Sequence, residues 1–218
     1  MDTSISPIIH FFMTEGVPFE TVLLILMLPI VATFIAFLRQ VVGIKAFGIY
    51  TPLIITFAFL ATNGLRYGVV IFLAVIFVGM LMRFILKPFR LLYLPRVAIM
   101  LTIVSLLILV MLTIGGTLKR TGLAGVSIFP ILIMITLVEK FVAVQIEKGN
   151  RTALILAFET LIISIFGFYI ASWELLIHLL VIHPWLIFIT IPINIALGKW
   201  TGLRLSEYFR FRNVIKKL

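Results

Sequence analysis

The sequence predicts an all-α integral membrane protein, a polytopic bundle of seven transmembrane helices with the N-terminus outside and the C-terminus in the cytoplasm. Of its 218 residues 63% are hydrophobic and only 12% are charged, and the mean hydropathy is +1.28, whereas soluble domains contain about 25% charged residues. The apolar residues form continuous runs bounded by charges and do not alternate with polar ones, which argues against a β-barrel. Because every backbone polar group in hydrocarbon must be paired within the protein, such runs are expected to be helices.

Seven runs approach the length of about 20 residues that crosses a bilayer. They lie between Glu20 and Arg39, Lys45 and Arg66, Arg66 and Arg83 with an end fraying toward Lys87, Arg96 and Lys119, about Thr121 and about Gln145, Arg151 and Glu174, and Glu174 and Lys199. The second and seventh are the least secure, because Pro52 and Pro192 interrupt them and a half-helix or re-entrant segment would have the same hydropathy. Without these two, five spans remain.

The basic residues give the predicted orientation. Cytoplasmic loops of membrane proteins are enriched in Lys and Arg, and an outside N-terminus places 15 of the 18 basic residues in the cytoplasm. Only Arg66, Lys119 and Arg120 then lie outside. This orientation divides the chain into a short extracytoplasmic segment (1–18), a transmembrane domain (19–200) and a basic cytoplasmic tail (201–218). The first 18 residues contain no Lys or Arg, so they lack the basic start of a signal peptide and the first helix is expected to stay.

Composition also limits the partners and cofactors. The net charge of +10 is explained by the cytoplasmic bias and by attraction to anionic lipid headgroups, so we expect a bilayer partner and no nucleic acid. The absence of cysteine excludes disulfides, thiolate nucleophiles and cysteine metal sites. His178 and His183 are five residues apart, whereas ligands on one helical face are three or four apart. We therefore expect no metal and no cofactor.

Glu159 is a candidate intramembrane polar site. It follows Arg151 by eight residues, or about 12 Å of helix, so it lies well inside the predicted sixth span. Ionisable groups at that depth are costly and often functional. One interpretation is a proton or cation site, and the other is a packing contact with a hydroxyl or an arginine of a neighbouring helix.

Glu139 is the second candidate, near the predicted cytoplasmic end of the fifth span. Its neighbour Lys140 points about 100° away around the helix, so the two do not simply neutralise each other. One interpretation is a structural ion-pair latch with Arg39, Arg83 or Arg96, and the other is a site for a substrate or partner. The turn from Arg39 to Pro52 contains Gly43 and Gly48, which permit close backbone approach, and Pro52 is expected to shape the start of the next helix.

Several motifs together resemble a known family. They are Arg39-Gln40, Gly43-Ile44, Phe47-Gly48 and Pro52; Pro95-Arg96, Ala98 and Leu101–Val104; Phe129-Pro130 and Glu139-Lys140; and Gly198–Leu205 followed by Phe209–Arg212. Across roughly residues 22–214 the chain is similar to the bacterial seven-transmembrane domain usually fused to an inactive transglutaminase-like domain. The resemblance implies seven helices in a bacterial cytoplasmic membrane, no established reaction, and genes near ATP-grasp ligases. The chain differs in lacking the extracytoplasmic domain, so it is expected to act alone or with a separate subunit.

Two hypotheses about function follow. The first is a scaffold or signal-coupling component that docks a cytoplasmic partner, with an ATP-grasp peptide-modification system as the partner class that the resemblance suggests. Its candidate docking or latch residues are Arg39, Lys45, Arg96, Lys140, Arg204, Arg210 and Arg212. The second is a small transporter or proton-coupled carrier that uses Glu159, expected to be a homo-oligomer because seven short helices enclose little volume. An enzyme is less favoured, because no acid and base converge in the sequence.

Overall fold

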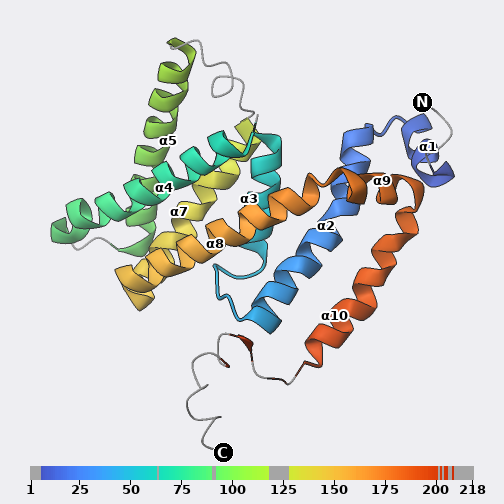
Figure 1. Ribbon diagram of the computed structural model, residues 1–218. Coiled ribbons are helices and arrows are strands. Elements are labelled where there is room, and N and C mark those ends of the chain that lie inside the picture. The colour runs from blue at the N-terminus through green and yellow to red at the C-terminus, as the bar shows by residue number, and fades with distance from the viewer. Residues whose placement is uncertain are drawn as a thin grey trace, which may run out of the picture. The chain divides into compact units, whose positions relative to one another are not determined.

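The apolar runs fold as helices, and the part of the chain that the structure describes contains no strand (Figure 1). This computed structural model describes residues 6–62, 64–89, 92–117 and 128–200, with 202, 204, 205 and 208, except for the side chains at 83, 87, 115–117 and 128. Five helices in these ranges are long and apolar enough to cross a membrane. They are α2 (Phe19–Phe37) with its continuation η1 (Leu38–Val42), α4 (Leu65–Leu86), α5 (Tyr93–Thr117), α7 (Ile128–Lys148) and α8 (Asn150–Ala171).

The two segments predicted least securely are the two that deviate. The second is the short helix α3 (Tyr50–Ala61), with 12 residues. The seventh is divided into α9 (Glu174–Ile182), the 3-10 helix η3 (Pro184–Ile189) and α10 (Thr190–Gly198), with a bend of 106° after α9. If this bent pair is counted as one span, the described residues contain up to six candidate spans.

The 106° bend in the seventh segment occurs at Pro184, whereas Pro192 lies further along, just after the 3-10 helix η3 gives way to α10. A proline disfavours helical geometry at the residue before it, and His183 has φ −126° and ψ 69°. Pro192 is the third residue of α10, which continues directly from η3 through Ile189 and Thr190 in helical conformation. Pro192 therefore marks a change of helix type within the segment, and Pro184 marks its bend.

First-turn prolines are a recurring feature of this chain. Pro52 in α3, Pro95 in α5, Pro130 in α7 and Pro192 in α10 are each the third residue of their helix. The prediction that Pro52 shapes the start of its helix is confirmed. The same pattern explains why α5 already begins at Tyr93, before the charge of Arg96 that was expected to bound it.

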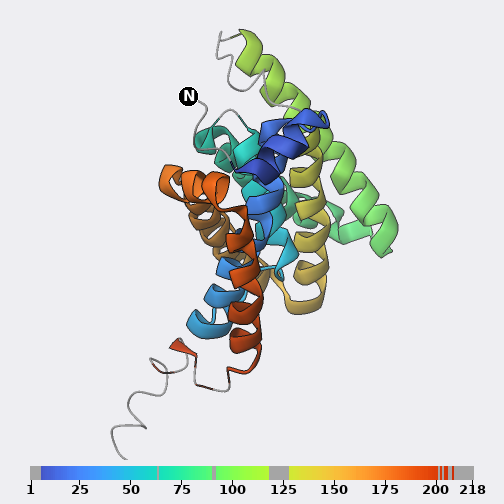
Figure 2. The same ribbon diagram turned by 90° about the vertical axis from the view of Figure 1, so that its right-hand side faces the viewer.

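The described residues divide into two compact units, of which unit 1 comprises residues 1–45 and 169–218. Within it α2 and α10 lie side by side (Figures 1 and 2). The amide of Asn194 in α10 donates a hydrogen bond of 2.7 Å to the hydroxyl of Thr33 in α2. The short helix α1 (Pro7–Thr14) packs against α2, and the N–H of Ser6 donates to the carbonyl of Val181.

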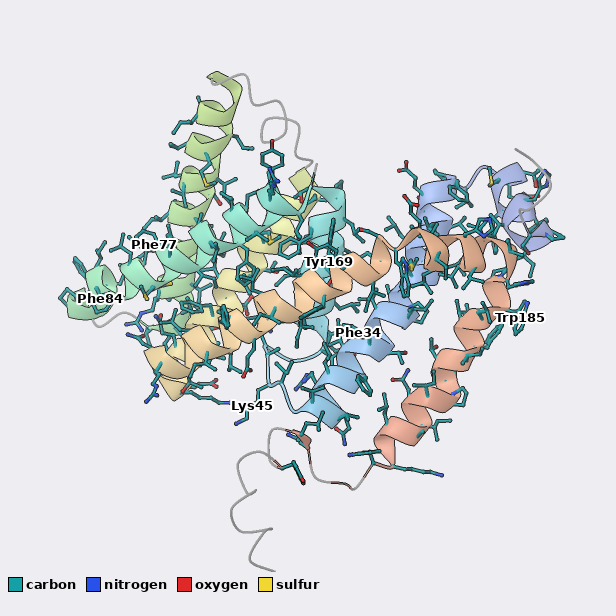
Figure 3. All side chains as sticks on the ribbon, viewed as in Figure 1. Phe34, Lys45, Phe77, Phe84, Tyr169 and Trp185 are labelled. Atoms are coloured by element: carbon teal, nitrogen blue, oxygen red, sulfur yellow. The ribbon has the colours of Figure 1, made fainter. Side chains whose placement is uncertain are left out.

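Unit 2 comprises residues 46–168 and contains α3, α4, α5, α7 and most of α8. Its core includes Phe59, Phe72 and Phe141, each at most 1% exposed. The end of α4 continues into a 3-10 turn, η2 (Lys87–Phe89), as predicted for an end fraying toward Lys87. Phe77 and Phe84 on α4 remain more than half exposed (Figure 3). Large apolar side chains on the outside of a spanning helix are suited to contact lipid.

Candidate functional site

The turn before α3 is shaped by three residues with positive φ: Gly43 at 90°, Ala46 at 41° and Gly48 at 81°. Glycine adopts such angles freely, and the N–H of Gly43 closes the end of η1 on the carbonyl of Leu38. Ala46 is different, because the Cβ of an L-residue disfavours the left-handed conformation by about 1–2 kcal/mol. Contacts from elsewhere in the fold must therefore hold Ala46 in place.

Two side chains of α8 provide these contacts. The carboxylate of Glu159 accepts a hydrogen bond of 3.1 Å from the N–H of Ala46, and the hydroxyl of Thr160 accepts one of 3.0 Å from the N–H of Phe47. Ala46 is 6% exposed, and a buried N–H left without a partner costs about 1–3 kcal/mol. Glu159 and Thr160 therefore cap the turn from which α3 starts, and we call residues 46–49 the capped turn.

The position of Glu159 places the capped turn deep in the bundle. Glu159 is the tenth of the 22 residues of α8, or about 14 Å from the start of that helix. Irregular backbone at membrane depth is tolerated only where it is buried in protein or lines a water-filled cavity. Glu159 and Thr160 of α8 accept hydrogen bonds from two N–H groups of the capped turn. Neither interpretation of Glu159 anticipated a backbone N–H as its partner.

The contacts between α8 and α3 continue along both helices. The hydroxyl of Ser164 donates to the carbonyl of Pro52 at 3.1 Å, and the hydroxyl of Thr56 lies 3.3 Å from the carbonyl of Ser164. Thr56, Thr160 and Ser164 are all completely buried. Pro52 has no backbone N–H to donate. Its carbonyl accepts hydrogen bonds from the hydroxyls of both Thr56 and Ser164. Hydroxyl groups thus bond α8 to the first turn of α3.

Small residues on α8 allow this close approach. A Cβ placed on Gly167 would lie 2.5 Å from the hydroxyl of Thr56, so only glycine fits there without a shift. Small residues at helix interfaces in membranes let backbones approach and hydrogen-bond across the interface. The buried face of α8 follows this pattern with Ala153, Ala157, Thr160, Ser164 and Gly167.

Unit 1 brings two of the distant sequence motifs together. The amide of Gln40 in η1 donates a hydrogen bond of 3.4 Å to the carbonyl of Trp200, which follows α10. Arg39 beside it is half-buried, and Lys199 and Arg204 are exposed. We call the basic residues that flank this hydrogen bond along the chain, Arg39, Lys199 and Arg204, the basic cluster. Arginine and lysine here can bind carboxylate or phosphate groups through charge-assisted hydrogen bonds.

The remaining predicted residues are more dispersed. Lys45, Glu139 and Lys140 are exposed. Arg96 is half-buried, and its Nε has no hydrogen-bond partner among the described residues. The side chain of Arg83 lies outside the described part, as do residues Arg210 and Arg212. The latch at Glu139 thus stays a prediction.

Sequence reasoning missed Thr56, Thr160 and Ser164, and it missed the contact between Gln40 and Trp200. A signal for Thr160 and Ser164 was present, since small and hydroxyl-bearing residues recur three or four positions apart along α8. In the described residues no group of three His, Asp or Glu side chains could hold a metal ion.

The comparisons with known proteins agree with the sequence pattern. A family described as seven transmembrane helices usually fused to an inactive transglutaminase matches residues 9–215. No curated protein and no solved structure matches the chain. The match covers the helices of both units and confirms the resemblance seen in the motifs. The chain is thus a multi-pass membrane protein that belongs to the family of seven-transmembrane domains usually fused to an inactive transglutaminase.

Proposed function

We propose that the protein is a membrane scaffold or signal-coupling component whose basic cluster docks an acidic segment of a cytoplasmic protein. The observation that carries the proposal is the hydrogen bond between Gln40 and Trp200, residues from motifs 160 positions apart. Gln40 directly follows Arg39, and Trp200 directly follows Lys199. The hydrogen bond therefore brings Arg39 and Lys199 to one local surface. Such a surface favours partners of opposite charge and accelerates their association.

The capped turn supports a coupling role. Lys45 is exposed and immediately precedes Ala46, whose N–H is bonded to Glu159 in α8. A displacement of Lys45 by a bound partner would therefore be transmitted to α8 through the peptide bond to Ala46 and the hydrogen bond from Ala46 to the carboxylate of Glu159. An ATP-grasp protein of peptide modification is the partner class that the family resemblance suggests.

Site-specific crosslinking in intact cells tests the docking proposal. A photoreactive amino acid replaces Arg39, Lys199 or Arg204 in turn, and Arg66, exposed at the start of α4, serves as the matched control. We expect the same soluble protein to be captured from all three cluster positions, in a salt-dependent manner, and not from Arg66. Capture of lipid alone at every position would contradict the proposal.

A second candidate is a proton-coupled carrier that uses Glu159. It is favoured by a carboxylate in the middle of a span beside irregular backbone, an arrangement that occurs at the binding sites of transporters with broken helices. The test is proteoliposome flux with Glu159→Gln, which keeps an acceptor for Ala46 but removes the titratable group. Flux equal to that of the wild type would remove this candidate.

A further inference from the structure

A pocket with an apolar lining lies within unit 1 between α1, α2 and η3. Its volume is about 500 Å³, within the range of pockets that bind small molecules. Such pockets usually carry a few polar groups that orient the ligand, whereas the side chains here are aliphatic or aromatic. They include Ile8 and Phe12 from α1, Val22 and Ile25 from α2, and Trp185 and Phe188 from η3.

The pocket is continuous with an exposed apolar surface of α2, a helix long and apolar enough to cross a membrane. Ile25 lines the pocket and is also 63% exposed, and its neighbour Leu24 is 43% exposed on the same spanning helix. Trp185 and Phe188 at the other side are more than half exposed, with Trp185 projecting from η3 (Figure 3). An apolar molecule in the bilayer can therefore enter the pocket without crossing water.

The bend in the seventh segment creates this space. Pro184 begins η3 directly after the break at His183, and α9 leaves at 106° to the segment that follows. The bend turns the chain after His183, and Trp185 and Phe188 line the pocket together with residues of the first turns of α2. The pocket is thus beside the start of the candidate span α2.

We propose that this pocket binds one acyl chain of a membrane phospholipid. The apolar lining selects a hydrocarbon chain, and its opening onto the exposed apolar surface of α2 selects a molecule that resides in the bilayer. Residues 1–38 and 152–198 contain no Lys or Arg, so these segments offer no cation to an anionic headgroup. Recognition therefore depends on the chain and not on the charge of the lipid.

Photolabelling tests the proposal. The purified protein is reconstituted in vesicles of phosphatidylethanolamine and phosphatidylglycerol with a trace of phosphatidylcholine that carries a diazirine midway along one acyl chain. After exchange into lipid-free detergent and illumination, peptide mapping locates the label. We expect retained label on residues 22–26 and 185–188. Ile25→Trp, which fills the pocket, should reduce it at least fivefold, while the control Leu24→Trp, outside the lining, should not.

Three results would overturn the proposal. The first is a wild-type protein that retains no label through the detergent exchange. The second is equal labelling of the two tryptophan variants, both checked by thermal unfolding. The third is crosslinking of these residues to a second copy of the chain in place of lipid. If Ile25→Trp does not fold, retention and location of the label in the wild type still decide.

Discussion

At the scale of single residues, Glu159 is the clearest departure from what hydropathy alone requires. Its carboxylate lies midway along α8 and accepts a hydrogen bond from Ala46, a residue with a left-handed backbone. This contact gives Glu159 a structural task whichever function the protein has. A structural task and a proton-transfer task respond differently to substitution, because the first needs an acceptor atom and the second needs a titratable group.

We expect Glu159→Gln to change stability little and Glu159→Ala to lower the free energy of unfolding by about 1–3 kcal/mol. Gln retains a carbonyl oxygen for the N–H of Ala46, whereas Ala leaves that buried N–H without this partner. Unfolding in mixed detergent micelles, followed by tryptophan fluorescence, measures the difference. Equal destabilisation by both variants would show that the charge of Glu159, and not its acceptor, matters for folding.

Gly167 makes a second prediction at this scale. Gly167→Ala should destabilise the protein by about 1–3 kcal/mol through overpacking, because its Cβ would lie 2.5 Å from the hydroxyl of Thr56. Gly198→Ala in α10 is the matched control, since a Cβ there meets no atom within 4 Å. Thr56→Ser removes one methyl group and should relieve part of the effect in the double variant. Similar unfolding midpoints for the two alanine variants would refute this account of α8 packing.

At the scale of elements, α3 and the bent seventh segment depart from simple spans. Both contain a proline as the third residue of a helix, and α3 begins at a turn held beside the middle of α8. Twelve residues extend only about 18 Å, which is shorter than the hydrocarbon core of about 30 Å. The start of α3 is therefore expected to lie within the bilayer.

Thiol labelling measures the environment of that start. The chain has no cysteine of its own, so single substitutions give an unambiguous signal. We expect Tyr50→Cys to react at least tenfold more slowly with a charged maleimide than Glu147→Cys, although both positions are exposed, because hydrocarbon suppresses the reactive thiolate. Fast labelling at position 50 would indicate a wet cavity and would favour the carrier over the scaffold.

At the scale of the whole molecule, the asymmetry of charge is the dominant property. Fifteen of 18 basic residues fall on one side when seven runs are assigned alternately, and this is the pattern that sets orientation in bacterial membranes. The distinctive motifs are concentrated on the same predicted side. The excess of Lys and Arg on the predicted cytoplasmic side is therefore predicted to set the membrane orientation of the chain and also to bind its cytoplasmic partner.

The orientation predicts opposite labelling at two positions. In intact cells an impermeant thiol reagent should modify Arg66→Cys and should leave Lys148→Cys unmodified until the membrane is permeabilised. Both positions are exposed in unit 2, at the start of α4 and the end of α7. Labelling of both from the same side would contradict the assignment of outside and cytoplasmic loops.

Much of the fold could be predicted because the bilayer acts on local sequence. A run of about 20 apolar residues between charges is driven to a helix by solvent alone, so α2, α4, α5, α7 and α8 were predicted to within several residues. The site was predicted only in part. Glu159 stood out as an acid within an apolar run, whereas the spacing of Thr160 and Ser164 along α8 indicates a close helix interface but not which backbone atoms their hydroxyls bond.

The membrane class, the apolar segments, their family and the charge asymmetry can be predicted without coordinates, because each depends on composition and spacing along the chain. The bend of the seventh segment at Pro184, the short length of α3 and the hydrogen bond between Glu159 and Ala46 across 113 positions become visible only in the folded chain. The physical reason is that a hydrogen bond depends on where two distant backbones lie. Hydropathy predicts that the segments containing Ala46 and Glu159 both lie in the membrane, but it does not specify that these two residues form a hydrogen bond.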